Sequence, residues 1–304
     1  LEIRPGGVAR FNGFSRYDTA ARLSKAQFTR SENAVLVSGE NFPDALAAGA
    51  YASTMNMPLL MTATDTLPEA TLNELERLGV QSVQIIGGNL AVGAEVEDML
   101  ETQGIAVERI YGNTRYETNA TLMQKTYATA KRAFLVSGEN FADGLSVVPI
   151  TLQQETPLLL TQAKNVPNAT KQVMTELGVT EVVIVGGKLA ISEAVEQELT
   201  EMDVTVSRID GATRYQTNIN LYREFGELEA TGAILACGER YMDALCGGYY
   251  AYRLAQPMIL TPSDDVLPGT LEYLKELELR EITILGGEMA ISPAVEQIVS
   301  DLLK

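Results

Sequence analysis

The chain has 304 residues, of which 40 are acidic and 23 are basic, so its formal net charge is −17. It contains no histidine, which excludes Ser-His-Asp and Cys-His catalysis and removes the commonest zinc ligand. Its acidic excess argues against nucleic-acid binding, and no apolar run reaches the roughly 20 residues of a membrane helix. We therefore expect a globular protein with no metal site, cofactor, nucleic-acid partner or membrane span.

Short apolar runs recur at regular intervals along the first third of the chain, with helical patterns between them. The runs are rich in Val, Ile and Leu, which is typical of strands buried on both faces of a parallel sheet. Ser15 has the character of a helix N-cap, and Gly79 that of a C-cap. This alternation predicts an α/β fold with parallel sheets flanked by helices. The runs are residues 34–37, 59–61, 83–86 and 106–110.

Four sequence blocks show that this unit of alternating strands and helices occurs three times in the chain. The block Gly-x-x-Arg-Tyr-x-Thr starts at residues 13, 112 and 211, a spacing of 99 residues. Three further blocks follow in the same order in each copy. The first is a Gly-Glu block with an aspartate four residues after the glutamate, the second is a Pro-apolar run ending in Thr, and the third is a Gly-Gly pair. The repeats predict three modules that pack on one another, because no flexible linker separates them. Their boundaries are placed at residues 1–109, 110–208 and 209–304.

The four blocks all follow predicted strands, so their residues are expected at the carboxyl edges of the sheets, where open α/β folds bind ligands. Two interpretations stay open for each set. The aspartates and arginines form either structural pairs, within or between copies, or ligand contacts. The tyrosines either pack or stack on a sugar, and the Gly-Gly pairs either shape a turn or offer N–H groups to an anion. The candidate ligand-binding residues are Arg16, Tyr17, Asp44, Gly87, Gly88, Arg115, Tyr116, Asp143, Gly186, Gly187, Arg214, Tyr215, Asp243, Gly286 and Gly287.

Catalysis is the alternative to binding. Glu40 and Asp44 are four residues apart and could form an acid/base pair for glycoside cleavage. However, every copy carries the same pair, and three identical binding sites in tandem give avidity, whereas three identical active sites would be unusual. We therefore expect no catalytic residues.

The blocks G-x-x-R-Y-x-T, S-G-E-N-F-x-D-A-L, P-[IL]-L-L-T and I-[IV]-G-G together resemble the cell wall binding repeat 2 (CWB2) family of Gram-positive surface proteins, including clostridial S-layer proteins. The resemblance covers about residues 8 to 304. It implies three Rossmann-like modules with pseudo-threefold symmetry. It also implies an anchoring role for the Pro-apolar block, here Pro58, Leu59, Leu60, Pro157, Leu158, Leu159, Pro257, Met258 and Ile259.

The same resemblance implies a non-catalytic anchor that holds a secreted protein non-covalently to an anionic secondary cell wall polysaccharide. The signal peptide and an effector domain are then expected outside this chain. The alternatives are a wall-active amidase or glycosidase, and a structural self-assembly or adhesion unit. The third copy departs most from the family pattern and carries 7 basic and 15 acidic residues over 209–304. An anionic polymer therefore needs a local cationic groove, bridging cations or contacts through sugar hydroxyls.

Overall fold

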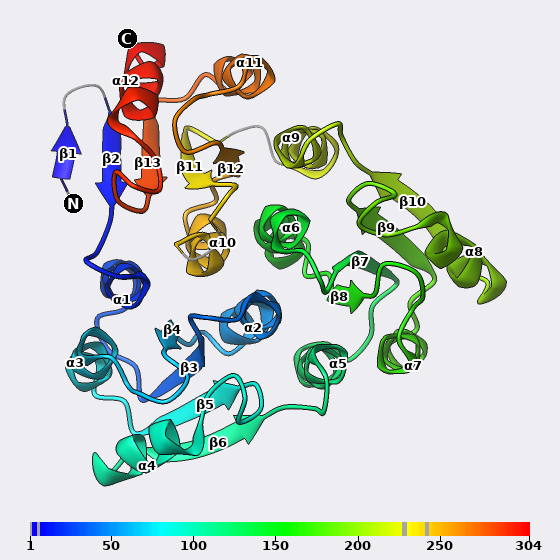
Figure 1. The fold of residues 1–304 in the computed structure, drawn as a ribbon, viewed down its shortest axis with the longest axis horizontal. Helices are drawn as coiled ribbons and strands as arrows, with labels where there is room; N and C mark the ends of the chain where they lie inside the picture. Colours follow the sequence, from blue (N-terminus) through cyan, green and yellow to red (C-terminus); the bar gives the residue numbers. More distant parts are fainter. Residues whose placement is uncertain (1, 5–6, 227–229, 241–242) are drawn as a thin grey trace.

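The computed structural model describes residues 2–4, 7–226, 230–240 and 243–304. Three sheets surround a centre formed by three mutually contacting helices: α2 (Phe42–Thr54), α6 (Phe141–Gln153) and α10 (Ala244–Arg253) (Figure 1). Each copy contributes one of these helices. The expected α/β fold of three modules with pseudo-threefold symmetry is confirmed.

Each of the three sheets contains four parallel strands in the same order. The first sheet has the order β4-β3-β5-β6 and the second β8-β7-β9-β10. Their strands are β3 (Asn33–Ser38), β4 (Leu59–Thr62), β5 (Ser82–Ile86), β6 (Ala106–Ile110), β7 (Arg132–Ser137), β8 (Leu158–Thr161), β9 (Glu181–Val185) and β10 (Thr205–Ile209). The sequence predicted the position of every strand in the first sheet, because each is a continuous apolar or half-apolar run.

The third sheet is completed by the beginning of the chain. Its parallel order is β12-β11-β13-β2, and β1 is added antiparallel to β2. Val8 pairs with Ile282 and Phe11 with Leu285, so the first and third copies share one sheet. The strands are β1 (Glu2–Arg4), β2 (Val8–Phe11), β11 (Gly232–Cys237), β12 (Met258–Thr261) and β13 (Glu281–Leu285).

This pairing shifts the sheets relative to the sequence repeats. The fourth strand of each sheet is the strand that opens the next repeat: β6, β10 and, around the ring, β2. The boundaries placed after residues 109 and 208 therefore fall inside β6 and β10. The reason is that a tandem repeat can be divided at any phase, whereas hydrogen bonding assigns a strand to one sheet.

Helices cover both faces of the sheets, with α2 and α6 toward the centre and α4 and α8 on the outside (Figure 1). Ser15, Thr114 and Thr213 each accept a hydrogen bond from the backbone N–H three residues later, as N-caps do. The remaining helices are α1 (Arg16–Gln27), α3 (Glu69–Leu78), α4 (Ala94–Thr102), α5 (Arg115–Thr126), α7 (Asn168–Leu177), α8 (Glu193–Glu201), α9 (Arg214–Phe225), α11 (Pro268–Glu276) and α12 (Pro293–Leu302).

The buried apolar residues of all three copies form one continuous cluster. The Pro-apolar blocks lie inside it: Leu59, Leu158 and Met258 are at most 4% exposed. In the second and third copies a buried asparagine on the neighbouring helix, Asn119 or Asn218, bonds the backbone of β8 or β12. The Pro-apolar side chains are therefore core residues, and any anchoring role for them has to be indirect. Among the described residues no helix has the length and apolarity needed to cross a membrane.

Candidate functional site

The carboxyl edge of each sheet meets the first helix of the next copy. Asp44 lies against the Gly-Gly turn of its own copy, with Oδ2 2.7 Å from where a Cβ on Gly87 would stand. Its carboxylate is also within electrostatic reach of Arg115 from the second copy. The same arrangement recurs around the ring. We name the three places junction 1/2 (Asp44, Gly87, Gly88, Arg115), junction 2/3 (Asp143, Gly186, Gly187, Arg214) and junction 3/1 (Asp243, Gly286, Gly287, Arg16).

Junction 2/3 contains an open pocket of about 160 Å³. Its walls come from two copies. The second copy contributes Asp143 and Gly187, and the third contributes the loop 211–213, Arg214 and Thr217. The lining carries hydroxyl, carboxylate and guanidinium groups together, so it is suited to a polar ligand. A single copy therefore does not contain a complete site.

The junction aspartates have raised pKa values. Burial raises the pKa of both Asp44 and Asp143 to about 6, and the arginine of the next copy opposes this only in part. Burial also raises the pKa of Asp243, against the lowering effects of Thr19 and Arg16. Asp44 Oδ1 is buried and has no hydrogen-bond partner within the described part of the chain. Such a buried, unpaired acceptor is costly in the folded state.

The repeated arginines use their donors within their own copy. Nη1 of Arg16, Arg115 and Arg214 donates to the carbonyl oxygen of Gly39, Gly138 and Gly238 at 2.5, 2.5 and 2.6 Å. Among the described side chains, no N···O distance of 4.0 Å or less joins one of them to a junction aspartate. The expected direct pairing is thus corrected. The arginine and the aspartate lie near each other across a junction, but the guanidinium donates its hydrogen bond to a backbone carbonyl and not to the carboxylate.

The repeated tyrosines pack beneath the Gly-Glu loops. A Cβ on Gly39, Gly138 or Gly238 would lie 2.7, 2.6 or 2.5 Å from Cε1 of the ring, so only glycine permits this contact. Tyr116 is 8% exposed, and Tyr17 and Tyr215 are half-buried. Of the two interpretations, packing is the one that these contacts favour.

The two glycines of each pair have different roles. Gly87, Gly186 and Gly286 have φ of 113°, 122° and 96°, which favours glycine, and their N–H groups donate to Ile110, Ile209 and Phe11. Those three amides are therefore not available to an anion. The N–H groups of Gly88, Gly187 and Gly287 have no partner in the part of the chain that the structure describes.

Comparison with known families decides what this architecture is. The chain matches the family "Cell wall binding domain 2 (CWB2)" over residues 10–97, 109–196 and 208–296. The chain belongs to the CWB2 family. These three matches coincide with the three repeats, and the family predicted from the motifs is confirmed.

Several known proteins contain a similar CWB2 region. The chain is 30% identical over 293 residues to the N-acetylmuramoyl-L-alanine amidase LytC of Bacillus subtilis (96% of this chain, 58% of LytC). It is 30% identical over 294 residues to the amidase enhancer of the same organism (96% of this chain, 40% of the relative). The solved structure of Cwp6 from Clostridium difficile matches with a TM-score of 0.89 at 26% identity, covering 100% of this chain and 49% of Cwp6. Cwp8 from the same organism matches with a TM-score of 0.87 at 27% identity, covering 97% and 52%. The chain thus spans about half the length of these relatives.

The CWB2 repeats contain a second arginine set that the sequence analysis missed. Arg10, Arg109 and Arg208 donate to the carbonyl oxygens of Gly286, Gly87 and Gly186 and pair with a glutamate on α12, α4 and α8, respectively. These arginines stabilise the Gly-Gly turns through the hydrogen bonds to the glycine carbonyl oxygens. The signal was present, because these arginines have the same 99-residue spacing as the first set. The pairs are Arg10–Glu296, Arg109–Glu97 and Arg208–Glu196.

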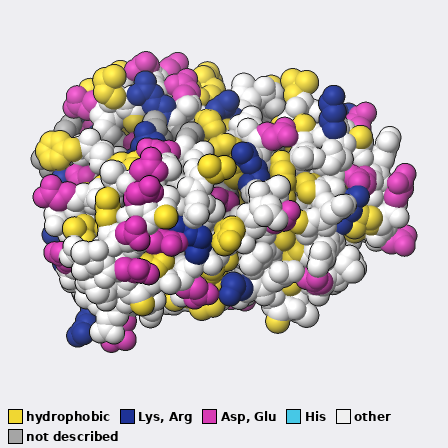
Figure 2. Space-filling view, turned by 60° about the horizontal axis from the view of Figure 1, so that its bottom comes forward, with side chains coloured by type: hydrophobic (Ala, Val, Ile, Leu, Met, Phe, Trp, Pro, Cys, Tyr) yellow, Lys and Arg dark blue, Asp and Glu magenta, His cyan; other side chains and the backbone are white. Residues whose placement is uncertain are grey.

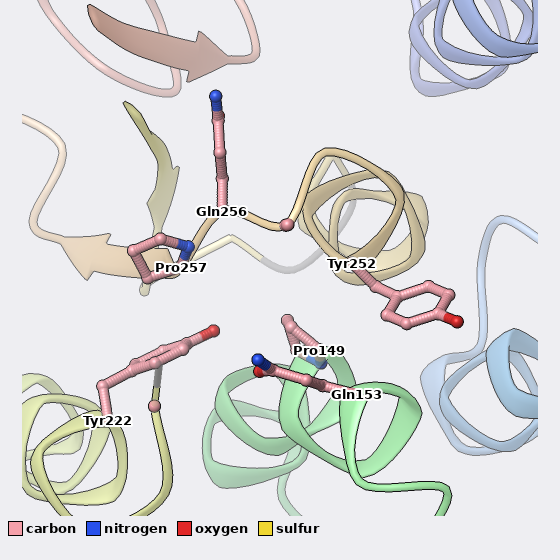
Figure 3. Close-up of a pocket in the computed structure, with 8 residues that line it drawn as sticks. Pro149, Gln153, Tyr222, Tyr252, Gln256 and Pro257 are labelled. Atoms are coloured by element: carbon pink, nitrogen blue, oxygen red, sulfur yellow. The ribbon is translucent and has the colours of Figure 1, made fainter. Parts of the chain in front are cut away.

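A second cavity lies at the opposite, amino-terminal edge of the third CWB2 sheet (Figure 3). It has a volume of about 140 Å³ and is lined by Pro149 and Gln153 of α6, Tyr222 of α9, and Tyr252, Gln256 and Pro257. The Tyr222 hydroxyl accepts from the Met258 N–H at 2.8 Å and so is already engaged. The residue that corresponds to Pro149 in the first copy is Ala50. This cavity therefore lacks the threefold recurrence of the junctions.

Proposed function

We propose that this CWB2 chain is a non-catalytic anchor that binds an anionic secondary polysaccharide of a Gram-positive cell wall non-covalently at its three junctions. The family and its structural relatives support cell wall binding and a cell-wall-associated surface protein. The observation that carries the proposal is the recurrence of one junction around the ring, each built from two copies. Three linked sites raise the overall affinity without new contacts.

The proposed contacts follow from which groups remain free. Arg115 is exposed, Arg16 and Arg214 are half-buried, and the second glycine of each pair offers an N–H group. Phosphate or carboxylate groups of a polymer are recognised by such donors. Asp44 and Asp143 add less negative charge at mildly acidic pH, because burial raises the pKa of both to about 6. The tyrosines and the buried Pro-apolar strands support these loops from below.

The wider surface gives an anion little attraction. On the face drawn in Figure 2, acidic and basic side chains lie interspersed with neutral and apolar ones, and no broad basic area is visible. With a formal net charge of −17, long-range attraction to a polyanion is absent. Affinity must therefore arise inside the junctions.

A wall hydrolase is the second candidate, and the Glu40–Asp44 pair is its only basis. Thr64 donates its hydroxyl to Glu40 at 2.6 Å, and Ser263 donates in the same way to Glu239 of the third copy at 2.9 Å. Through these hydrogen bonds the two glutamates connect one loop to another and so stabilise the loops. LytC is named an amidase, and this chain covers 58% of it, so we propose that any catalytic activity of a longer protein lies in an attached effector domain.

The test is a sedimentation assay with purified Gram-positive walls before and after extraction of the non-peptidoglycan polymer. The proposal expects binding to intact walls, loss of binding after extraction, and no release of sugar or peptide. Equal binding to extracted walls would refute the polymer as ligand. Release of reducing sugar or free amino groups would instead establish the hydrolase.

A further inference from the structure

An open groove lies beside junction 1/2, between α5 and α7. Its volume is about 470 Å³, within the roughly 300–1,000 Å³ typical of ligand pockets. Its polar lining includes Asn113, Glu117, Thr121, Gln124 and Gln172, and no lysine or arginine lines it. The groove thus offers amides, a hydroxyl and a carboxylate to a ligand, but no positive charge.

An exposed aromatic ring lines this groove, and an exposed aliphatic side chain lies in the Gly-Gly turn that the ring borders. Tyr111 follows β6, lines the groove and is 55% exposed. Its Cδ2 lies 3.7 Å from where a Cβ on Gly88 would stand, so the ring borders the Gly-Gly turn. That turn is closed by the Ala91 N–H donating to the Gly88 carbonyl, and it presents Leu90, which is 95% exposed.

An exposed apolar side chain at the tip of the Gly-Gly turn, here called the apolar tip, is present in all three copies. Leu189 and Met289 occupy the corresponding turns of the other copies and are 102% and 78% exposed. A large apolar side chain in full contact with water at all three equivalent positions gains nothing for the fold, because apolar groups stabilise only when buried. The aromatic side chain is not repeated, because the residues that correspond to Tyr111 in the other copies are Asn12 and Asp210. Junction 1/2 therefore combines an aromatic ring, an aliphatic tip and a polar groove.

The charges near the groove restrict its ligand. The Asn113 N–H donates to Glu117, and Gln124 and Gln172 both donate to Glu176. These carboxylates repel a phosphate or carboxylate group that approaches within a Debye length. An uncharged ligand with many hydroxyls does not incur this repulsion. A ligand that also has an apolar face gains contact area on Tyr111 and Leu90.

We propose that this groove binds an uncharged saccharide segment of the wall polymer, with the C–H face of one sugar ring on Tyr111 and Leu90 and the hydroxyls of the next on the groove amides. The inference rests on the proposed function and names the part of the polymer that is recognised here. Junction 1/2 then binds neutral sugar beside the anionic group held at Arg115.

The probe is the mixture of neutral oligosaccharides that hydrofluoric acid releases from purified wall polymer, because this acid cleaves phosphodiesters and spares most glycosidic bonds. The chain has no tryptophan, so Tyr111→Trp places a single indole at the groove. We expect its emission to shift to the blue on titration. Calorimetry should give an affinity within about threefold of the unmodified chain for Tyr111→Phe and at least about tenfold weaker for Tyr111→Ala. Leu254→Ala, which alters another exposed side chain at the end of α10, is the matched control and should change nothing.

The outcomes separate this inference from the proposed function. If the unmodified chain sediments with walls but neutral oligosaccharides do not bind, or bind Tyr111→Ala equally well, this inference is overturned and the anchor stands. If the chain does not sediment with walls at all, the proposed function fails. An emission shift of the Tyr111→Trp variant with neutral phosphatidylcholine vesicles and none with oligosaccharide would assign the tip to lipid and also overturn the inference.

Discussion

Junctions 1/2 and 3/1 have the same geometry but are joined differently. At junction 1/2 the chain runs directly from β6 into α5, so the two copies are covalently continuous. At junction 3/1 the strand that leads into α1 is β2, and only hydrogen bonds and side chains attach it to β13. The ion pair behind the turn differs accordingly. The Arg10 and Glu296 side chains are 6% and 9% exposed, whereas those of Arg109 and Glu97 are 11% and 31% exposed. The least continuous junction thus has the most enclosed ion pair.

The strongest test of this comparison is Arg10→Ala against Arg109→Ala. Removing Arg10 breaks a buried ion pair with Glu296, which should lower the free energy of unfolding by about 3–5 kcal/mol. Arg109→Ala should cost less, about 1–3 kcal/mol, because water reaches Glu97 and the lost bonds are mainly to backbone carbonyls. Urea unfolding followed by circular dichroism measures both. Arg22→Ala, which removes an exposed pair with Asp18, is the control. Equal losses for Arg10→Ala and Arg109→Ala would contradict the comparison.

The junction aspartates should make stability fall as pH rises. The folded pKa of about 6 for Asp44 and Asp143 lies above the value of roughly 3.9 for an unfolded aspartate, so the native state binds more protons between these pH values. The favourable contribution is complete below about pH 4 and lost by about pH 6 to 7. We expect Asp143 to account for about 2 kcal/mol of this decline.

Asp143→Asn isolates that contribution. The variant should show a flatter dependence of unfolding free energy on pH between 4 and 7, measured by urea titration at several pH values. Asp203→Asn, at an exposed position after α8, is a suitable control and should retain the full decline. A parallel curve for Asp143→Asn would show that its carboxyl does not titrate abnormally.

Arg115→Ala asks whether the covalently continuous junction 1/2 uses its arginine for folding or for binding. Because Arg115 is exposed and makes one hydrogen bond to Gly138, its loss should cost only about 1 kcal/mol of stability. Wall binding should fall several-fold, because a ligand contact is removed from one of three linked sites. Thermal unfolding and wall sedimentation measure the two effects. A destabilised variant with full wall binding would identify a structural strut.

The smallest expected effect is that of salt on binding. Contacts at a junction act at short range, while the acidic surface repels a polyanion at long range, where salt screens most strongly. Affinity for purified polymer should therefore stay level or rise slightly from low to physiological ionic strength. A steep decrease would require an exposed cationic patch. A strict need for divalent cations would point to metal bridges between the acidic residues and the polymer.

The sequence predicted the elements and the edge where the site lies, for a definite reason. Asp44 and Gly87 each follow a continuous apolar strand, and parallel strands bring their carboxyl ends together. The junctions between copies could not be predicted in the same way. The pairing of Val8 with Ile282 depends on contacts across nearly the whole chain, and no local pattern specifies it. The partner of Arg115 was also beyond sequence reasoning, since either a carboxylate or a carbonyl satisfies a guanidinium.

The closure of the third sheet by β2 also determines where other polypeptides can be joined. β1 pairs with β2, and α12 packs on β2, so both ends of the described chain lie beside the third sheet but at opposite ends of β2: Glu2 pairs with Arg10, whereas Leu303 lies beside Gly7 (Figure 1). A domain fused ahead of β1 would leave near the carboxyl edge of the third sheet, and a domain fused behind α12 would leave near its amino edge. It would stand away from junctions 1/2 and 2/3 in either case. Both attachment points therefore lie beside the third sheet, one at each of its edges.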